Sequence, residues 1–302
     1  MFDFAVERVW LPSRGLSLGL WREGIGGYPL VLLHGYPETK RIWARCVEPL
    51  SAAGFEVIVP DLRGYGDSDF APDRFYDPPA YGRDVYALVH DVLGHEMCGM
   101  AGGDVGGAVV YDLSARFEGF VERQALFNTV APNLDQLYAA SGLVSERPGW
   151  PIADYFERQG SDGDGLIDEL ATPALRRAYV AGMYTHRLWA QPGSFSREDV
   201  GWHTEPFADR DRLRAAYGVY EVAYGKRPLS EAPALTEPSP VETLILFGES
   251  DHVVTGAFMD RCQLAFPHHM GPFLVPRAGH FLQWERPHPL VSALIMLFRD
   301  KL

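Results

Sequence analysis

Apolar runs alternate with amphipathic stretches along most of the chain, a pattern typical of strands and helices in turn. Short apolar runs predict strands at residues 30–33, 55–60, 95–100, 123–128, 242–247 and 272–276, and two earlier segments, 5–10 and 16–21, predict an opening hairpin. Helical periodicity predicts helices over 39–53, 81–93, 109–113, 256–266 and 289–298. The alternation favours a doubly wound, mostly parallel sheet with its functional loops at the carboxyl ends of the strands.

One interval between strands is much longer than the others. Roughly 110 residues separate the strand at 123–128 from the strand at 242–247, where a connecting α/β unit needs only about 30. Helical patterns occur within this interval at 175–188 and 209–224, and prolines lie at both of its ends. We therefore expect a core domain of residues 1–131 and 238–302, with residues 132–237 inserted as a helical cap over the site.

Asp104 is the one non-glycine residue in the turn between an expected strand and the helix that follows it. A strand, a sharp glycine-rich turn and a helix are the setting of a nucleophile elbow, which usually carries Ser. A carboxylate is already ionised near neutral pH, and it forms an ordinary ester when it attacks a saturated carbon. An epoxide or a carbon–halogen bond is therefore the expected electrophile. The alternatives are a turn whose Asp caps the helix and a glycine-rich cofactor site.

Asp251 and His280 each follow a later strand of the expected sheet. Alone, Asp251 is explained as a turn residue and His280 as a histidine with a satisfied surface or core position. Together with Asp104 they give the order nucleophile, acid, histidine, each at the carboxyl end of a strand. The three residues are therefore predicted to form a catalytic triad.

Five motifs, taken together, resemble the Asp-nucleophile branch of the α/β-hydrolases. The motifs lie at residues 34–37, 61–68, 103–107, 248–251 and 279–281. That branch contains epoxide hydrolases, haloalkane dehalogenases and haloacetate dehalogenases. The resemblance covers nearly the whole core and implies an α/β-hydrolase fold with an inserted helical cap and no cofactor.

The same resemblance assigns roles to particular residues. The backbone N–H groups of Tyr36 and Val105 are expected to form an oxyanion hole, the first beside a cis peptide before Pro37. His280, oriented by Asp251, is expected to activate the water that hydrolyses the ester. His34 is then a structural histidine of its loop.

The dehalogenases of this branch carry donors that are absent here. Val105 stands where haloalkane dehalogenases usually have Trp, and Tyr36 stands where some of them have Asn. Val105 and Ala108 stand where haloacetate dehalogenases usually have two arginines. The chain therefore lacks side chains on which haloalkane and haloacetate dehalogenases rely.

Epoxide hydrolases of the branch use two cap tyrosines, whose neutral phenols donate to the opening oxygen. Tyr155 lies in a segment similar to the one that holds the first, and Tyr220 lies where we expect the second. Tyr217 is the alternative for the second role, and for each residue a plain core or surface aromatic is the competing interpretation.

These residues predict an epoxide hydrolase that opens a small apolar epoxide to a vicinal diol, with water as the second reactant. The intermediate would be an alkyl ester on Asp104. A haloalkane or haloacetate dehalogenase with the same nucleophile is the alternative, and a catalytically idle hydrolase fold used for binding is a third.

Net charge and cysteine content indicate which partners and which cell compartment to expect. The formal net charge of −13 argues against nucleic acid or an anionic membrane as partner. Three cysteines, Cys46, Cys98 and Cys262, lie far apart, as expected of core thiols in a reducing compartment, so a cytoplasmic protein is expected. The resemblance to epoxide hydrolases implies a detoxification role. We identify no secretory signal and no stretch of membrane-spanning length. The oligomeric state stays open, with a homodimer as one option.

The acidic segment 162–168 imitates part of an EF-hand calcium loop. Gly160 and Ala171 occupy the first and last ligand positions of that loop, so no metal is expected. We interpret the segment as an acidic loop that leads into a cap helix.

Overall fold

The computed structural model describes residue 2 and residues 4–143, 154–187, 189–254 and 257–302. Residues 188 and 256, each an end of one expected helix, lie outside the described part of the chain.

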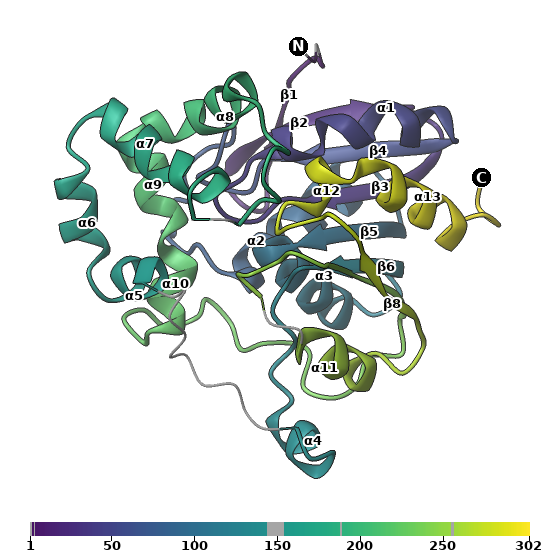
Figure 1. Cartoon of the computed structure of the whole chain (residues 1–302). Helices are drawn as coiled ribbons and strands as arrows, with labels where there is room; N and C mark the ends of the chain where they lie inside the picture. The colour runs from purple at the N-terminus through teal and green to yellow at the C-terminus, as the bar shows by residue number, and fades with distance from the viewer. Residues whose placement is uncertain (1, 3, 144–153, 188, 255–256) are drawn as a thin grey trace.

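A mostly parallel sheet of eight strands forms the centre of the described structure, in the order β1-β2-β4-β3-β5-β6-β7-β8 (Figure 1). The strands are β1 (Glu7–Leu11), β2 (Leu16–Glu23), β3 (Tyr28–Leu33), β4 (Phe55–Pro60), β5 (Cys98–Gly103), β6 (Val121–Phe127), β7 (Glu242–Gly248) and β8 (His269–Val275). Strand β2 runs antiparallel to β1 and β4, and the other pairs are parallel. The expected hairpin and doubly wound sheet are confirmed.

Helices cover both faces of this sheet, as fully buried strands such as β4 and β5 require (Figure 1). On one face, α1 packs against α12 and α13, and on the other α2 packs against α3, with α11 beside β7 and β8. Their bounds are α1 (Ala44–Ala52), α2 (Pro78–Tyr86), α3 (Asp104–Arg116), α11 (Ala257–Ala265), α12 (Leu282–Glu285) and α13 (Pro287–Leu297).

Local capping shifts two helix boundaries from their expected positions. Helix α2 begins at Pro78, three residues earlier than expected, because the Asp77 side chain accepts from the Ala80 N–H and Pro78 suits the first turn. It continues as a π-helix, η2 (Ala87–Val92). The helix expected from residue 39 starts as a 3₁₀ turn, η1 (Lys40–Trp43), before α1.

The long interval between β6 and β7 is helical in its described part. Its elements are α4 (Asp135–Ala140), α5 (Asp154–Ser161), α6 (Gly163–Glu169), α7 (Pro173–Tyr184), α8 (Arg197–Thr204), η3 (Glu205–Ala208), α9 (Arg210–Ala216) and α10 (Gly218–Ala223). Helices α5 to α10 form a group beside the sheet, whereas α4 lies apart from them (Figure 1). Helix α4 contacts α11 of the core, where Arg261 lies over the Tyr138 ring.

The helix expected over 209–224 is divided into α9 and α10 at Tyr217. Glycine at 218 weakens helical continuity, and it is required because a Cβ there would lie 2.6 Å from the Tyr76 Cβ. This close approach brings α10 against the core.

The acidic segment is not the loop that we expected, because residues 163–169 form α6. Asp162 caps this helix by accepting from the Gly165 N–H at 3.2 Å. Asp164 pairs with Arg214 at 2.7 Å, and Asp168 pairs with Arg210 at 2.6 Å. The carboxylates thus serve a helix cap and surface ion pairs.

In the part of the chain that the structure describes, every helix is too short or too polar to cross a bilayer.

Candidate active site

Asp104 lies at the junction of β5 and α3 with a φ of +48°, in the left-handed region that a non-glycine residue seldom adopts. Its N–H donates to the Asn128 carbonyl at 3.0 Å. The turn depends on small neighbours, since a Cβ on Gly35 would lie 2.5 Å from the Asp104 Cβ. These contacts give the strained geometry of a nucleophile elbow, with the carboxylate projecting at the carboxyl end of β5.

The structure brings Asp104, Asp251 and His280 together. His280 Nε2 lies 3.3 Å from Asp104 Oδ2, and His280 Nδ1 lies 3.1 Å from Asp251 Oδ2. The other oxygen of Asp251 accepts from the N–H groups of Val253 at 2.7 Å and Val254 at 3.2 Å. Asp251 is therefore fixed by its own loop and presents one oxygen to the imidazole.

Opposing effects act on the pKa of His280. Burial favours the neutral ring, but the carboxylates of Asp251 and Asp104 outweigh it and hold the pKa well above its usual value. While both acids are ionised, the imidazole is therefore held in its protonated form.

The loop after β3 supplies a donor to the nucleophile. The Tyr36 N–H donates to Asp104 Oδ1 at 2.7 Å, and the Tyr36–Pro37 peptide is cis, as expected. The Val105 N–H lies in the first turn of α3, where backbone N–H groups have no partner within the helix. His34 Nε2 accepts from the Leu62 N–H, and burial lowers its pKa, which suits a neutral histidine that holds the loop.

Glu38 stabilises the loop after β3 through buried hydrogen bonds. It is buried, its Oε2 accepts from the Gly35 N–H at 2.7 Å, and its Oε1 accepts from Gln283 Nε2 at 3.0 Å. Burial raises the pKa of Glu38 to about 8, which exceeds the opposing effect of the Gly35 hydrogen bond. No pattern in the sequence pointed to this residue.

We expect Glu38 to make folding sensitive to pH. In the unfolded chain its carboxyl ionises near pH 4.5, whereas the folded protein retains the proton up to about pH 8. Its contribution to stability is therefore complete below pH 4.5 and is lost as the pH rises through 8. Glu38→Gln should reduce the loss of unfolding free energy across this window, measured by urea titration on either side of it. The exposed Glu48→Gln is the control, and equal losses in wild type and Glu38→Gln would contradict the assignment.

The rings of Tyr155 from α5 and Tyr220 from α10 meet edge to face, with centroids 5.8 Å apart and planes at 83°. Burial raises the pKa of both phenols well above 10, and Asp104 raises both further. Burial also raises the pKa of the Tyr217 hydroxyl, but the neighbouring groups that act on this pKa are Tyr179, which raises it, and Arg214, which lowers it. Of the two candidates in this segment, Tyr220 is therefore the one near the carboxylate.

Asn128 is a residue that our sequence reasoning missed. It follows β6 with a φ of +44°, and its amide nitrogen donates to the carbonyls of Gly279 at 2.8 Å and His280 at 3.0 Å. Its amide oxygen accepts from the Gly248 N–H at 2.8 Å, and its carbonyl accepts from Asp104. Asn128 thus joins the loops of all three residues, those of Asp251 and His280 through its side chain and that of Asp104 through its backbone carbonyl. An Asn directly after a buried strand was the available signal.

Glu285 holds the histidine loop from its other side. Its carboxylate accepts from the N–H groups of Gly279 and Phe281, both at 2.9 Å, which flank His280. It also accepts from the Gln191 N–H at 2.7 Å, and the His280 N–H donates to the Trp189 carbonyl at 2.7 Å. The histidine loop is therefore tied to the segment between α7 and α8.

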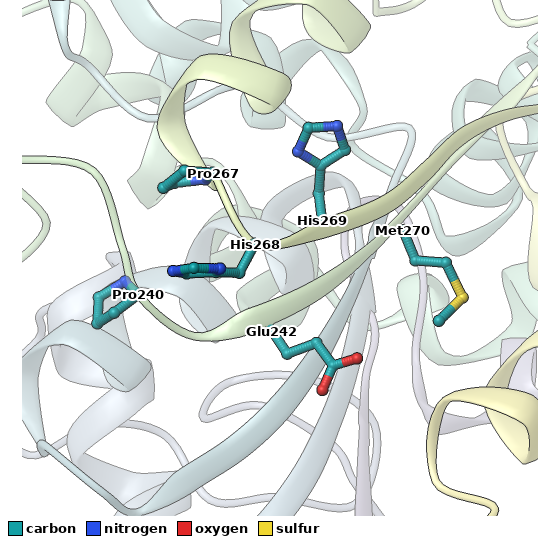
Figure 2. Close-up of a pocket in the computed structure, with 6 residues that line it drawn as sticks. All are labelled: Pro240, Glu242, Pro267, His268, His269 and Met270. Atoms are coloured by element: carbon teal, nitrogen blue, oxygen red, sulfur yellow. The ribbon is translucent and has the colours of Figure 1, made fainter.

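A hollow of about 710 Å³ lies away from this site (Figure 2). Its lining consists of Pro240, Glu242, Pro267, His268, His269 and Met270. Glu242 begins β7, whereas Asp251 follows the carboxyl end of that strand, so the hollow and Asp251 lie at opposite ends of β7. Glu242 is also paired with Arg123 at 3.0 Å. Over the described ranges, no group of three or more His, Cys, Asp or Glu side chains is placed to hold a metal ion.

A model of the alpha/beta hydrolase fold family matches residues 28–287, which include every residue of the triad. The chain belongs to this family. The soluble epoxide hydrolase of Corynebacterium sp. (strain C12) is 29% identical to this hydrolase over 280 residues, which cover 90% of each chain. The AB hydrolase superfamily protein YisY of Bacillus subtilis (strain 168) is 35% identical over 262 residues, 80% of this chain and 90% of that protein. The solved structure of epoxide hydrolase CorEH without ligand covers 99% of both chains, with a TM-score of 0.84 and 24% identity.

Proposed function

We propose that this α/β-hydrolase is an epoxide hydrolase that converts a small, largely apolar epoxide to a vicinal diol. The observation that carries the proposal is the convergence of Tyr155 and Tyr220 near Asp104, because two neutral phenols beside a carboxylate suit the opening of a strained C–O bond. The likeness to the epoxide hydrolase of Corynebacterium supports it.

In the first step Asp104 Oδ2 attacks an epoxide carbon, and the bond from that carbon to the ring oxygen breaks. Oδ1 is held by the Tyr36 N–H at 2.7 Å, whereas Oδ2 has the longer contact of 3.3 Å with His280 Nε2, so Oδ2 is the oxygen that attacks. The alkoxide takes a proton from one phenol while the other donates a hydrogen bond to it. The product is a hydroxyalkyl ester on Asp104.

In the second step water hydrolyses this ester. Esterification removes the negative charge of Asp104, which is one of the two charges that keep the pKa of His280 high. The pKa of the ring therefore falls, and the imidazolium gives its proton through solvent to the phenolate left by the first step. The neutral ring then takes a proton from water, and the hydroxide attacks the Asp104 carboxyl carbon. The tetrahedral oxyanion forms at Oδ1, beside the N–H groups of Tyr36 and Val105, and collapses to release the diol.

We further propose that helices α5 to α10 act as a cap that closes the site. Tyr155 and Tyr220 come from this group, and the Tyr184 hydroxyl of α7 donates to the Pro37 carbonyl of the oxyanion loop at 2.6 Å. Tyr155 and Tyr220 are almost fully buried, so these helices exclude water from the first step.

A screen of the purified protein tests the proposal against its rivals. The protein is incubated separately with styrene oxide, a bromoalkane and fluoroacetate, and diol and halide are measured. Diol from styrene oxide with little halide is the expected result. Faster halide release would support a dehalogenase, and no product from any of them would favour a binding protein.

A further inference from the structure

Gln159 is a buried amide that the catalytic steps above leave unused. It lies on α5 one helical turn after Tyr155, so the two side chains share a face of the helix. Its Nε2 donates to the Tyr36 hydroxyl at 2.6 Å and to the Tyr179 hydroxyl at 2.9 Å. Its Oε1 is buried without a hydrogen-bond partner, a state that costs free energy.

The amide retains one unpaired end in either orientation. Phenol hydroxyls both donate and accept, so a Gln159 amide turned by 180° would still be satisfied by Tyr36 and Tyr179 at one end only. In one orientation the free end accepts a hydrogen bond, and in the other it donates one. A hydroxyl group is the ligand that can pair with both.

The Gln159 amide is connected to the reacting carboxylate of Asp104 through Tyr36. Its partner Tyr36 holds Asp104 through the backbone N–H, and the Tyr36 ring lies edge-on to Tyr220 at 5.2 Å. The Tyr217 hydroxyl, which lies in the same group of phenols, is likewise buried without a partner. Unpaired polar groups are therefore grouped on the side of the site where Tyr36 meets α5 and α10.

We propose that Gln159 is a specificity-determining residue that binds a hydroxyl group carried by the substrate next to its epoxide ring. This inference rests on the proposed function and narrows its substrate class to epoxy alcohols. The hydroxyl would satisfy the free end of the Gln159 amide, while the rest of the substrate packs against aromatic rings. An alkyl epoxide of the same size would leave the amide unpaired.

Glycidol and terminal butylene oxide test this, because they differ only by a hydroxyl in place of a methyl group. We expect wild type to have the higher kcat/KM for glycidol, and Gln159→Leu to lower the ratio of the two values by about 10- to 100-fold. Gln159→Met is the second variant, with a side chain of similar length, and should lower the ratio in the same direction. Diol formation is followed for both substrates.

The matched control is Gln124→Leu. Gln124 is a buried amide of β6 with one partner, Thr243, and an equally unpaired Oε1, so the control removes a comparable group away from the site. It should leave the ratio unchanged. If both Gln159 variants slow the two substrates equally, Gln159 only supports Tyr36 and the inference is overturned while the proposed function stands. If wild type forms diol from styrene oxide but from neither of these epoxides, the inference is overturned and the proposed function stands. If it forms diol from none of the three, both fail.

Discussion

His280→Gln is expected to form the covalent ester on Asp104 but to hydrolyse it about a thousandfold more slowly than wild type, within the range of general-base contributions. The base acts only on the attacking water, so its removal blocks the second step. The first step needs the Asp104 carboxylate, which the Tyr36 N–H still holds in place. Intact-protein mass spectrometry after addition of styrene oxide should show a mass increase equal to the substrate.

The position of the adduct decides the outcome of this experiment. Peptide mapping should place it on Asp104, and Asp104→Ala in the His280→Gln background should abolish it. His268→Gln is the control, because His268 lines the distant hollow and should leave turnover unchanged. An adduct on another residue, or none in a variant that still binds substrate, would contradict the proposed division of labour.

Tyr155→Phe and Tyr220→Phe are each expected to slow alkylation by an epoxide about 100-fold, by analogy with the loss of one oxyanion-hole donor. The double variant should be nearly inactive. The ring stays in place in each variant, so the hydroxyl alone is removed from the buried pair. Single-turnover kinetics with styrene oxide, which isolate the ester-forming step, are the measurement.

Tyr217→Phe is the matched control for these variants, because Tyr217 is buried on the neighbouring turn of the same segment. It should affect alkylation much less than Tyr220→Phe. If Tyr217→Phe is crippling and Tyr220→Phe is neutral, Tyr217 is the second donor. Full epoxide turnover in both the Tyr155 and the Tyr220 variant would show that these phenols are not the donors and would remove the observation that carries the proposed function.

The sheet could be predicted because parallel strands buried on both faces leave continuous apolar runs in the sequence. The carboxyl ends of parallel strands also lie at one edge of a sheet, so the sequence alone predicts that Asp104, Asp251 and His280 converge. The structure places them as expected, with His280 between the two carboxylates.

Other features depend on tertiary contacts that no local pattern reveals. Glu285 looks like an ordinary acid beside a proline-rich helix start, yet four hydrogen bonds converge on its carboxylate. Helix α6 was hidden because glycines and acids in alternation are typical of loops. Its cap, Asp162, belongs to the same acidic segment, while its arginine partners come from elsewhere in the fold.

The amide of Asn128 has a consequence for redesign of this protein. The side-chain amide bonds to the loops of Asp251 and His280, and the backbone carbonyl of Asn128 accepts from the Asp104 N–H. The three loops are therefore not independent of one another. A loop transplanted from a relative would have to reproduce a backbone group at the correct point of this amide. Exchanges that keep residues 103–107, 128, 248–251 and 279–281 together as one unit should therefore succeed more often than exchanges of any one loop.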